Sequence, residues 1–297
     1  MSRDRRGDGV QVVGGSNPPC PTKILPVIDI HPPDGVIAAA DAERLAGELG
    51  LGFAGLMTAL LSHAAEFARP PISEFKVGAI ARGASGNLYY GANVEFAGEA
   101  LSFTVHAEQS AVTNAWMHGE TGIDTIAVTA APCGYCRQFL NELTTASSLV
   151  VQMPKETKSL AELLPSAFGP RDLGIEGGLL QRDDHGLSSD GHNDLVRAAL
   201  AAANMSYAPY SKSYAGVALR ANGTTVAGAY AENAAFNPSM SPLEVAMSLL
   251  NLQRIPLDAI TEAVLVHVDG LHTNATRTVL AAVCEAPLRL VKARNSR

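Results

Sequence analysis

The spacing of apolar residues changes along the first half of the chain, and each change predicts a different element. From Asp41 to Phe67 apolar side chains recur at helical spacing, and Pro70 and Pro71 end the run. Two shorter apolar runs, 77–81 and 88–94, then flank a turn rich in glycine, serine and asparagine. This arrangement predicts a helix followed by a β-hairpin.

Helical and strand patterns continue to alternate after the hairpin. We expect a helix over 106–118, a buried strand over 123–130 and a further helix over 133–143. Alternation of helices with strands is typical of domains in which helices pack on a sheet. The pattern therefore predicts an α/β sandwich built on one mixed sheet.

The second half of the chain repeats this order, and residues match at a nearly constant offset. A proline, a serine and a glycine of the stretch 71–81 recur 138 residues later, in the stretch 209–219. A glycine and a glutamate of 91–95 recur at 228–232, an offset of 137, as expected if the hairpin turn has lost one residue. Glycines and prolines fall at turns in any α/β protein, but a duplication explains more of these matches.

The duplication divides the chain into two similar domains, which we call the first and the second copy. A helix over 194–204, a strand over 263–268 and a helix over 274–284 take the places of their counterparts in the first half. We expect a flexible tail over 1–24, an N-terminal helical segment and the first copy over 25–157, a linker over 158–190, and the second copy over 191–297.

Composition and charge limit the classes of protein to which the chain can belong. The chain has 297 residues, of which 47% are apolar and 17% charged, and its formal net charge is −7. It is therefore long enough to bury a core and too acidic to hold nucleic-acid backbones by bulk charge. The longest uncharged apolar run, Leu49 to Ser62, is shorter than the roughly 20 residues that cross a bilayer, so no membrane association is expected.

The cysteines indicate a reducing compartment. Four cysteines in so long a chain are no disulfide framework, and the amino terminus lacks the basic-then-apolar layout of a secretory signal. We therefore expect a cytoplasmic protein, in which a close pair of cysteines binds metal or performs redox chemistry.

One histidine and two closely spaced cysteines form the strongest chemical signal. His106 and Glu108 precede the strand over 123–130, and Cys133 and Cys136 follow it. One imidazole and two thiolates suit zinc, and three protein ligands leave the fourth tetrahedral position for water, as in catalytic sites. The pattern therefore predicts a catalytic zinc site.

Two alternatives to a catalytic zinc site are weaker. A closed structural site needs a fourth ligand, but His118 lies about 18 Å from His106 along a helix, too far to complete one tetrahedron. A thioredoxin-like redox pair would not need a His-x-Glu motif upstream of the two cysteines.

The spacing of these residues places them at helix starts. Cys133 and Cys136 are three residues apart, so at a helix N-terminus both sulfurs face the same way and the unpaired N–H groups favour thiolate. His106 and Glu108 reach one point only within the first turn of a helix. Zinc, two thiolates and a neutral imidazole sum to zero charge, which leaves the metal acidic enough to lower the pKa of its water to about 7.

Glu108 is a carboxylate beside the metal that is not needed as a ligand. A glutamate in a first helical turn ordinarily complements the helix dipole. Beside zinc it can also take a proton from water, deliver it to a ring nitrogen, and later protonate a leaving amine. This sequence of proton transfers is hydrolytic deamination.

These motifs resemble those of cytidine deaminases. His-x-Glu with Pro-Cys-x-x-Cys is a signature of zinc deaminases. The stretches FKVGAIARG, GANVEF, HAEQSAVTNAW, PCGYCRQFLNEL and AENAAFNP together are similar to the long, two-copy form of cytidine deaminase, and the similarity runs from about Leu25 to the carboxyl end. The resemblance implies a cytidine-deaminase-like three-layer sandwich, a homodimer, and one zinc ion per chain. It implies conversion of cytidine and 2′-deoxycytidine to the uridines and ammonia, a reaction of pyrimidine salvage.

The resemblance also implies a role for each site residue. The implied zinc ligands are His106, Cys133 and Cys136, with Glu108 as the catalytic proton shuttle. The implied substrate-binding residues are Asn93 and Glu95 on the ribose hydroxyls, Phe75 stacked on the pyrimidine, and backbone groups of Ala107 and Ala131 at the base edge. Without the resemblance, Asn93 and Glu95 would be ordinary strand-edge polar residues, and Phe75 a core aromatic.

Two further side chains of the catalytic helices are less informative. Arg137 either donates to a thiolate or lies solvated on its helix, and the sequence does not decide between these. Trp116 is expected to fill the core.

The second copy has lost the zinc ligands. Neither histidine nor cysteine occurs from 232 to 250, and the positions of the two cysteines fall on Gly270 and Thr273. We expect the nearby His272 to be a surface residue. The second copy is therefore expected to persist as architecture, in a dimer that reproduces the four-domain packing of single-copy relatives.

Two other functions compete with nucleoside deamination. A deaminase acting on a cytosine or adenine base in nucleic acid would share the metal motif but should carry basic clusters with stacking aromatics. The chain is acidic, and only 5% of its residues are aromatic, so we expect a small nucleoside and no nucleic acid as its substrate. A non-catalytic zinc module that binds nucleosides is the other alternative.

Overall fold

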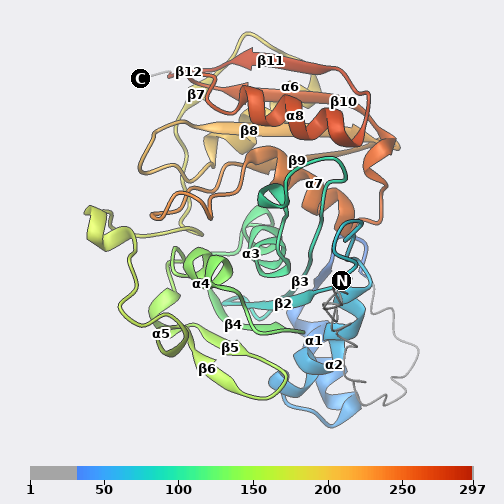
Figure 1. Cartoon of the computed structure of the whole chain (residues 1–297), viewed down its shortest axis with the longest axis vertical. Coiled ribbons are helices and arrows are strands. Elements are labelled where there is room, and N and C mark those ends of the chain that lie inside the picture. Colours follow the sequence, from blue (N-terminus) through green and yellow to red (C-terminus); the bar gives the residue numbers. More distant parts are fainter. Residues whose placement is uncertain (1–31, 296–297) are drawn as a thin grey trace, which may run out of the picture.

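The first half of the protein is built on a six-stranded mixed sheet (Figure 1), and the computed structural model describes residues 32–295. The strand order is β1-β3-β2-β4-β5-β6. These strands are β1 (Val36–Ile37), β2 (Gly78–Gly83), β3 (Leu88–Ala92), β4 (Ile123–Val128), β5 (Val150–Gln152) and β6 (Thr157–Ser159). β2 and β3 form the expected antiparallel hairpin, and β4 and β5 are parallel. The tail expected over 1–24 lies outside the described residues.

The second half contains a four-stranded sheet with the same internal order. Its strands are β8 (Ala215–Ala221), β9 (Thr224–Ala229), β10 (Ile260–His267) and β11 (Leu288–Lys292). Read as β9-β8-β10-β11, this sheet repeats β3-β2-β4-β5: two antiparallel pairs are followed by one parallel pair. The expectation of a duplicated mixed sheet is confirmed.

Helices cover both faces of each sheet. On the outer faces lie α1 (Ala39–Leu49) and α2 (Phe53–Ala65) in the first copy and α6 (Asp194–Asn204) in the second. On the inner faces lie α3 (Ala107–Met117) and α4 (Gly134–Leu140) in the first copy, and α7 (Pro242–Leu252) and α8 (Thr273–Val283) in the second. α3 contacts α7, so one continuous core runs between the two sheets (Figure 1). Each copy is thus a three-layer sandwich, and the two copies share their inner core.

Two equivalent glycines let the inner helices approach their sheets closely. A Cβ atom at Gly91 would lie 2.2 Å from the backbone nitrogen of Ala111 in α3. A Cβ atom at Gly228 would lie 2.3 Å from the backbone nitrogen of Ala246 in α7. Any side chain at either position would therefore push the helix off the sheet. The match also sets the correspondence between the helices: residues of α3 and α7 correspond at an offset of 135.

The single helix expected over 41–67 is two helices instead. α1 ends at Leu49, α2 begins at Phe53, and the two are bent by 99°. Gly50 has a left-handed φ of +62°, and its N–H bonds back to the carbonyls of Ala46 and Gly47, which ends α1. The apolar spacing continues across this break and so conceals it. Among the described residues, no single helix is long and apolar enough to cross a membrane, and the bent pair meets the length and composition criterion only when joined.

The segment between the copies, expected as a linker over 158–190, contains short elements. They are α5 (Leu160–Leu163), the 3₁₀ helix η3 (Pro170–Leu173) and β7 (Leu187–Ser188), which pairs with β12 (Arg294–Asn295). Leu160 and Leu179 are buried in the shared core, and Leu187 is buried under α6. The segment therefore packs on both copies. The other 3₁₀ helices are η1 (Leu101–Phe103), η2 (Ala146–Ser148) and η4 (Leu257–Ala259).

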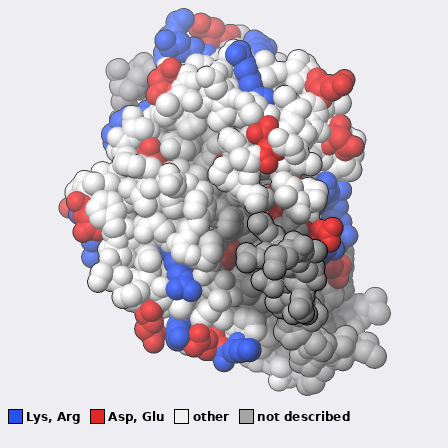
Figure 2. Space-filling model, viewed as in Figure 1, with Lys and Arg blue, Asp and Glu red and all other residues white. Residues whose placement is uncertain are grey.

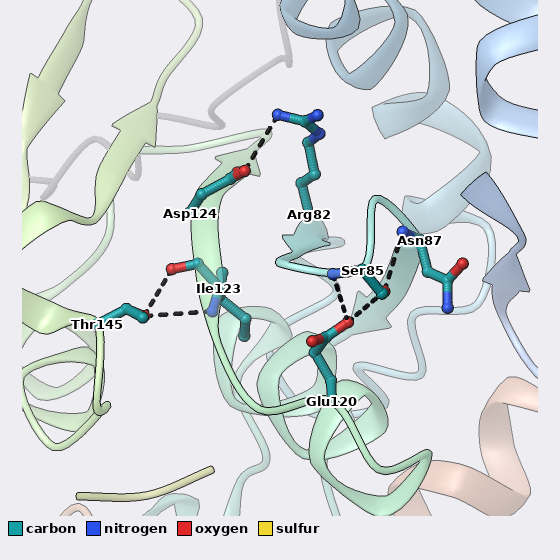
Figure 3. Close-up of polar contacts among 7 residues, drawn as sticks. All are labelled: Arg82, Ser85, Asn87, Glu120, Ile123, Asp124 and Thr145. Atoms are coloured by element: carbon teal, nitrogen blue, oxygen red, sulfur yellow. Dashed lines mark hydrogen bonds and ion pairs between the residues drawn. The ribbon is translucent and has the colours of Figure 1, made fainter. Parts of the chain in front are cut away.

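A buried glutamate holds the turn between β2 and β3 (Figure 3). Glu120 accepts a hydrogen bond of 2.5 Å from the Ser85 hydroxyl and another from the Thr121 N–H. Burial alone would raise the pKa of Glu120, but these hydrogen bonds lower it below its ordinary value. Arg82 of β2 pairs with Asp124 of β4 at 3.0 Å, which ties the hairpin to the next strand.

Candidate active site

Two helix starts meet at one point in the first copy. His106 is the N-cap residue of α3, and Cys133 is the N-cap residue of α4, which also carries Cys136. The His106 Nδ1 lies 3.6 Å from the Cys133 sulfur, and the two sulfurs are 3.7 Å apart. A tetrahedral zinc with Zn–S of about 2.3 Å and Zn–N of about 2.0 Å separates its ligands by roughly 3.5 to 3.8 Å. The three side chains therefore have the spacing of a zinc ligand set.

These three residues form the group within the described part of the chain that is suited to hold a metal ion. Their ligand atoms all lie within 4.8 Å of one another, and both cysteines are free thiols. His118 is not part of the group, because its Nδ1 contacts the Asn114 carbonyl at 2.8 Å. Three ligands without a fourth protein donor are typical of an open, catalytic zinc site.

The ligand set is prepared for deprotonation. The pKa of Cys133 is lowered to about 3, because its sulfur accepts hydrogen bonds from Cys136 and from His106. Cys136 keeps its proton through this bond and through burial, which raise its pKa. A metal ion that binds here displaces that proton, since thiolates and not thiols are metal ligands.

Glu108 lies beside the ligands in the second position of α3. Its side chain is only 4% exposed. Burial raises the pKa of Glu108, and hydrogen bonds from its own backbone and from Cys136 only partly oppose this. A carboxyl group whose pKa moves toward neutrality can both accept and donate a proton near pH 7.

A pocket of about 420 Å³ opens above the ligand set. Its lining brings together eight of the nine sequence-predicted site residues: Phe75, Asn93, Glu95, His106, Ala107, Glu108, Ala131 and Cys133. The ninth, Cys136, is fully buried behind Cys133. The volume lies in the range of small-molecule sites.

Two polar residues of the pocket shape its wall. The Asn93 amide accepts from the Val77 N–H at 2.8 Å and donates to the Phe75 carbonyl at 2.9 Å. The Glu95 carboxylate accepts from the Ile72 and Ser73 N–H groups at 2.8 and 2.9 Å. Both side chains therefore hold the segment 72–77, which carries Phe75 to the rim. Because Phe75 is 46% exposed there, it is not a core aromatic.

The pocket also contains residues that sequence reasoning missed. They are Ser73, Val77, Leu101, Thr104 and Ala130. Thr104 matters most among them, because its buried hydroxyl has no hydrogen-bond partner among the described residues. Thr104 precedes His106 by two residues in extended backbone, so the alternation of side chains could have placed both on the same side.

Arg137 has a role that neither alternative anticipated. Its guanidinium donates to the Pro132 carbonyl at 2.8 Å and to the Leu163 carbonyl at 2.9 Å. It therefore ties the start of α4 to the end of α5. Trp116 is buried in the shared core, as expected.

The second copy has filled the place of the pocket with its own side chains. Tyr230 stands where the first copy has Asn93, and its ring centroid lies 4.2 Å from that of His272. The expectation that His272 is a surface residue was wrong: it is 7% exposed and its Nε2 contacts the Ser213 carbonyl. Burial lowers the pKa of His272, which favours the neutral ring. The sequence shows only a lone histidine near a turn, and it does not show that Tyr230 packs against the imidazole.

Comparisons with known proteins agree with this geometry. Two family models described as the cytidine and deoxycytidylate deaminase zinc-binding region match residues 55–153 and 160–279. A cytidine deaminase of Aliivibrio fischeri is 48% identical over 267 residues, which cover 88% of this chain and 90% of that protein. A cytidine deaminase of Photobacterium profundum is 51% identical over 244 residues, which cover 80% of this chain and 83% of that protein.

Among solved structures, cytidine deaminase from Mycobacterium tuberculosis is 34% identical, with a TM-score of 0.34, and covers 37% of this chain and 91% of that one. The first copy holds a ligand set with zinc spacing beside a buried glutamate, and both copies match zinc-binding deaminase models. The chain belongs to the cytidine deaminase family, in its long two-domain form.

Proposed function

We propose that this enzyme converts cytidine and 2′-deoxycytidine, with one water molecule, to uridine and 2′-deoxyuridine plus ammonia. The observation that carries the proposal is the buried Glu108 carboxyl beside three ligands with zinc spacing, at the floor of a pocket of about 420 Å³. The names of the two bacterial relatives support cytidine as the substrate.

His106, Cys133 and Cys136 would hold one zinc ion per chain. When bound, zinc supplies a Lewis acid that activates water for attack at neutral pH. As thiolates, Cys133 and Cys136 would balance the two positive charges of the zinc ion, and a site without net charge suits a neutral nucleoside.

Glu108 carries the protons. Its carboxylate accepts a proton from the water that adds to C4 of the pyrimidine and passes it to ring N3. It then accepts the remaining proton of the new C4 hydroxyl and donates it to the exocyclic amine, so that the C4 carbonyl forms while the C4–N bond breaks and ammonia leaves. Because burial raises its pKa, Glu108 exchanges protons with both partners at little cost.

The pocket wall would bind the rest of the nucleoside. Asn93 and Glu95 would bind the ribose hydroxyls, and Phe75 at the rim would stack on the pyrimidine. Backbone groups of Ala107 and Ala131 would contact the edge of the base. We add Thr104 to this set, because this residue lines the same pocket and its buried hydroxyl has no partner among the described residues.

Charge favours a nucleoside over a nucleic acid. Figure 2 shows lysines and arginines scattered around the rim of one face, interspersed with acidic residues, without a continuous basic patch on that face. Nucleic-acid deaminases need basic grooves with stacking aromatics. A gel shift with RNA or single-stranded DNA at low salt tests this point, and stable binding would favour the nucleic-acid alternative.

We infer that the enzyme works as a homodimer. Large apolar side chains are exposed around the pocket mouth and on the nearby loop of the second copy: Ile72, Phe75, Leu101 and Phe236. Burying these exposed apolar side chains against a second chain would lower the free energy and favour a dimer. Analytical ultracentrifugation checks this, and a monodisperse, active monomer would remove the dimer.

We also propose that the enzyme is located in the cytoplasm and that it acts in pyrimidine salvage. The two ligand thiols, 3.7 Å apart, must stay reduced to bind zinc, which a reducing compartment ensures. Fractionation of the source cells tests the location.

The direct test of the proposed function uses the purified full-length chain. We expect one zinc ion per chain by metal analysis, loss of the ultraviolet absorbance of cytidine, and one ammonia released per cytidine consumed. Removal of zinc by a chelator should abolish turnover, and added zinc should restore it. Zinc-loaded protein that binds cytidine without releasing ammonia would instead support the non-catalytic module.

A further inference from the structure

A loop of the second copy lies against the helices that carry the zinc ligands. This loop, residues 233–238, is closed by the β-bridge between Ala231 and Met240 and contains the exposed Phe236. Its own backbone is tightly tied: the Asn233 side chain accepts from the Ala235 N–H at 2.9 Å, and the Asn233 N–H donates to the Ser239 hydroxyl at 2.9 Å. The loop therefore has one defined shape to present to the first copy.

The start of this loop is anchored to α4 and to Glu142, two residues beyond the end of that helix. The Asn233 amide donates to the Gln138 carbonyl at 3.1 Å, and the Ala234 N–H donates to the Glu142 carboxylate at 2.9 Å. Glu142 is fully buried and also accepts from the hydroxyls of Tyr207 and Tyr210, at 2.8 and 2.5 Å. A buried carboxylate with three donors from the second copy fixes the loop relative to α4.

The end of the loop reaches the residues that surround His106. Two consecutive carbonyl groups point at the first copy: Asn237 accepts from the Tyr135 hydroxyl at 2.5 Å, and Pro238 accepts from the Gln109 amide at 3.2 Å. The other end of each donor touches His106. The Gln109 side-chain oxygen accepts from the His106 N–H at 3.1 Å. The Tyr135 ring stacks on the imidazole, with centroids 5.3 Å apart and planes inclined by 22°.

We propose that the loop 233–238 of the second copy positions His106 for zinc ligation, and that Gln109 and Tyr135 are the positioning residues through which it acts. Gln109 holds the His106 backbone and Tyr135 holds its ring, while the loop holds both. The metal-free copy thereby completes the metal site of its partner copy within one chain. The inference rests on the proposed zinc ligation by His106 and not on the identity of the substrate.

This arrangement explains why a copy without zinc ligands retains the loop. Gln109 is almost fully buried, so its amide needs partners. Its nitrogen donates to the Pro238 carbonyl, and its side chain also hydrogen-bonds Tyr135, the second residue that the loop holds. Partners behind a metal ligand fix the orientation of its ring and commonly change metal affinity by 10- to 100-fold when they are lost.

The test measures how fast the holoenzyme releases zinc to a chromogenic chelator, a readout independent of turnover. Gln109→Leu removes both amide contacts at nearly constant volume, and we expect zinc release about 10-fold faster. Tyr135→Phe keeps the stacked ring and loses only the hydroxyl bond, so we expect a smaller acceleration, about 3-fold. Tyr89→Phe is the matched control, because its hydroxyl bonds to Glu120 away from the ligands; its release rate should equal that of the wild type.

A variant within the loop separates positioning from local damage in the first copy. Pro238→Gly loosens the backbone that carries both carbonyls without touching any residue of the first copy's ligand set. We expect faster zinc release than in the wild type, and in the double variant Gln109→Leu/Pro238→Gly an acceleration smaller than the product of the two single effects, because both changes act in part through the Gln109–Pro238 contact. The visible spectrum of the cobalt-substituted protein should shift in the same variants, since it reports ligand geometry.

The outcomes separate this inference from the proposed function. Release rates within 2-fold of the control for all three variants, with melting temperatures showing that they fold, would overturn the positioning role. Additive effects of Gln109→Leu and Pro238→Gly would overturn the route through the loop. A chain that shows the expected release rates but no cytidine turnover would keep the positioning role and overturn the proposed function.

Discussion

The starts of helices α3 and α7 occupy equivalent places in the two copies but serve different ends. α7 begins with an ideal capping box: the Glu244 N–H bonds to the Ser241 hydroxyl at 3.2 Å, and the Ser241 N–H bonds to the Glu244 carboxylate at 2.8 Å. α3 begins with His106, whose ring turns toward the two cysteines. α3 keeps one half of such a box, the Gln109 oxygen on the His106 N–H, and places a metal ligand where α7 has its capping hydroxyl.

The same contrast holds at the neighbouring positions. The Ser239 hydroxyl of the second copy accepts from the Asn233 N–H. Its counterpart, the Thr104 hydroxyl, has no partner among the described residues, and Thr104 lines the pocket. Leu243 is buried where the first copy buries Glu108. Without a ligand to bind, the second copy satisfies its polar groups locally. A binding site is therefore visible as the set of positions where those local rules are broken.

The largest effect is expected from giving α3 the cap of α7. His106→Ser removes the imidazole ligand, so zinc content should fall to background and cytidine turnover should drop by roughly 10⁴-fold or more. The metal-free variant should nevertheless be more stable than the metal-free wild type, by about 1 kcal/mol, because serine caps the helix. Chemical unfolding of both metal-free proteins measures this gain, and a loss of stability would contradict the account of the cap.

Removing the buried carboxyl should leave the metal in place. For Glu108→Gln we expect kcat to fall by about 10³- to 10⁴-fold, because proton acceptance and proton donation both pass through this group. Zinc content should stay at one per chain. The matched control is Glu244→Gln, which makes the same replacement at the capping glutamate of α7 in the second copy and should retain full turnover. Equal losses in both variants would refute the special role of Glu108.

The capping glutamate of α7 should make stability depend on pH. Burial raises the pKa of Glu244 to about 7, above its value in the unfolded chain. The folded protein therefore favours the protonated Glu244 carboxyl. The stability that this group contributes is greatest below about pH 4.5 and is lost as the pH rises toward 7 and the carboxyl ionises. We expect the free energy of unfolding to fall by about 1 to 2 kcal/mol over this range. This is less than the full pKa shift implies, because the Glu244 side chain keeps some contact with solvent.

Glu244→Gln should remove this part of the pH dependence, since glutamine also completes a capping box. Denaturant unfolding at pH 5 and pH 8 measures the effect as the difference between wild type and variant. Parallel curves for the two proteins would show that Glu244 does not titrate in this range.

The smallest effect is expected at the hydroxyl that lacks a partner. Thr104→Val keeps the shape of the side chain, and we expect KM for cytidine to rise about 5-fold with kcat nearly unchanged, the loss of one neutral hydrogen bond. Ser239→Ala in the second copy is the counterpart and should lower stability by about 1 kcal/mol without changing KM. Steady-state kinetics and thermal unfolding of the two variants distinguish these results.

Most of the regular elements were predictable, because periodicity reports local backbone geometry. α3, β4, α6, β10 and α8 form within a few residues of their expected bounds. The helix over 41–67 was the exception: Gly50 takes a left-handed conformation that apolar spacing cannot reveal. His272 was misassigned for a related reason, since its burial depends on Tyr230, which lies more than forty residues away in the chain.

The sequence alone determined the chemistry of this protein: a His-x-Glu motif, a pair of cysteines at helical spacing, and a second copy without either. Those residue types specify a zinc ligand set and a proton carrier wherever the chain places them. Only the tertiary structure decided that Thr104 lines the pocket, and that a loop of the second copy holds Gln109 and Tyr135 around His106. Such contacts join segments about a hundred residues apart, and their geometry depends on how two sheets and their helices pack together, which no local pattern records.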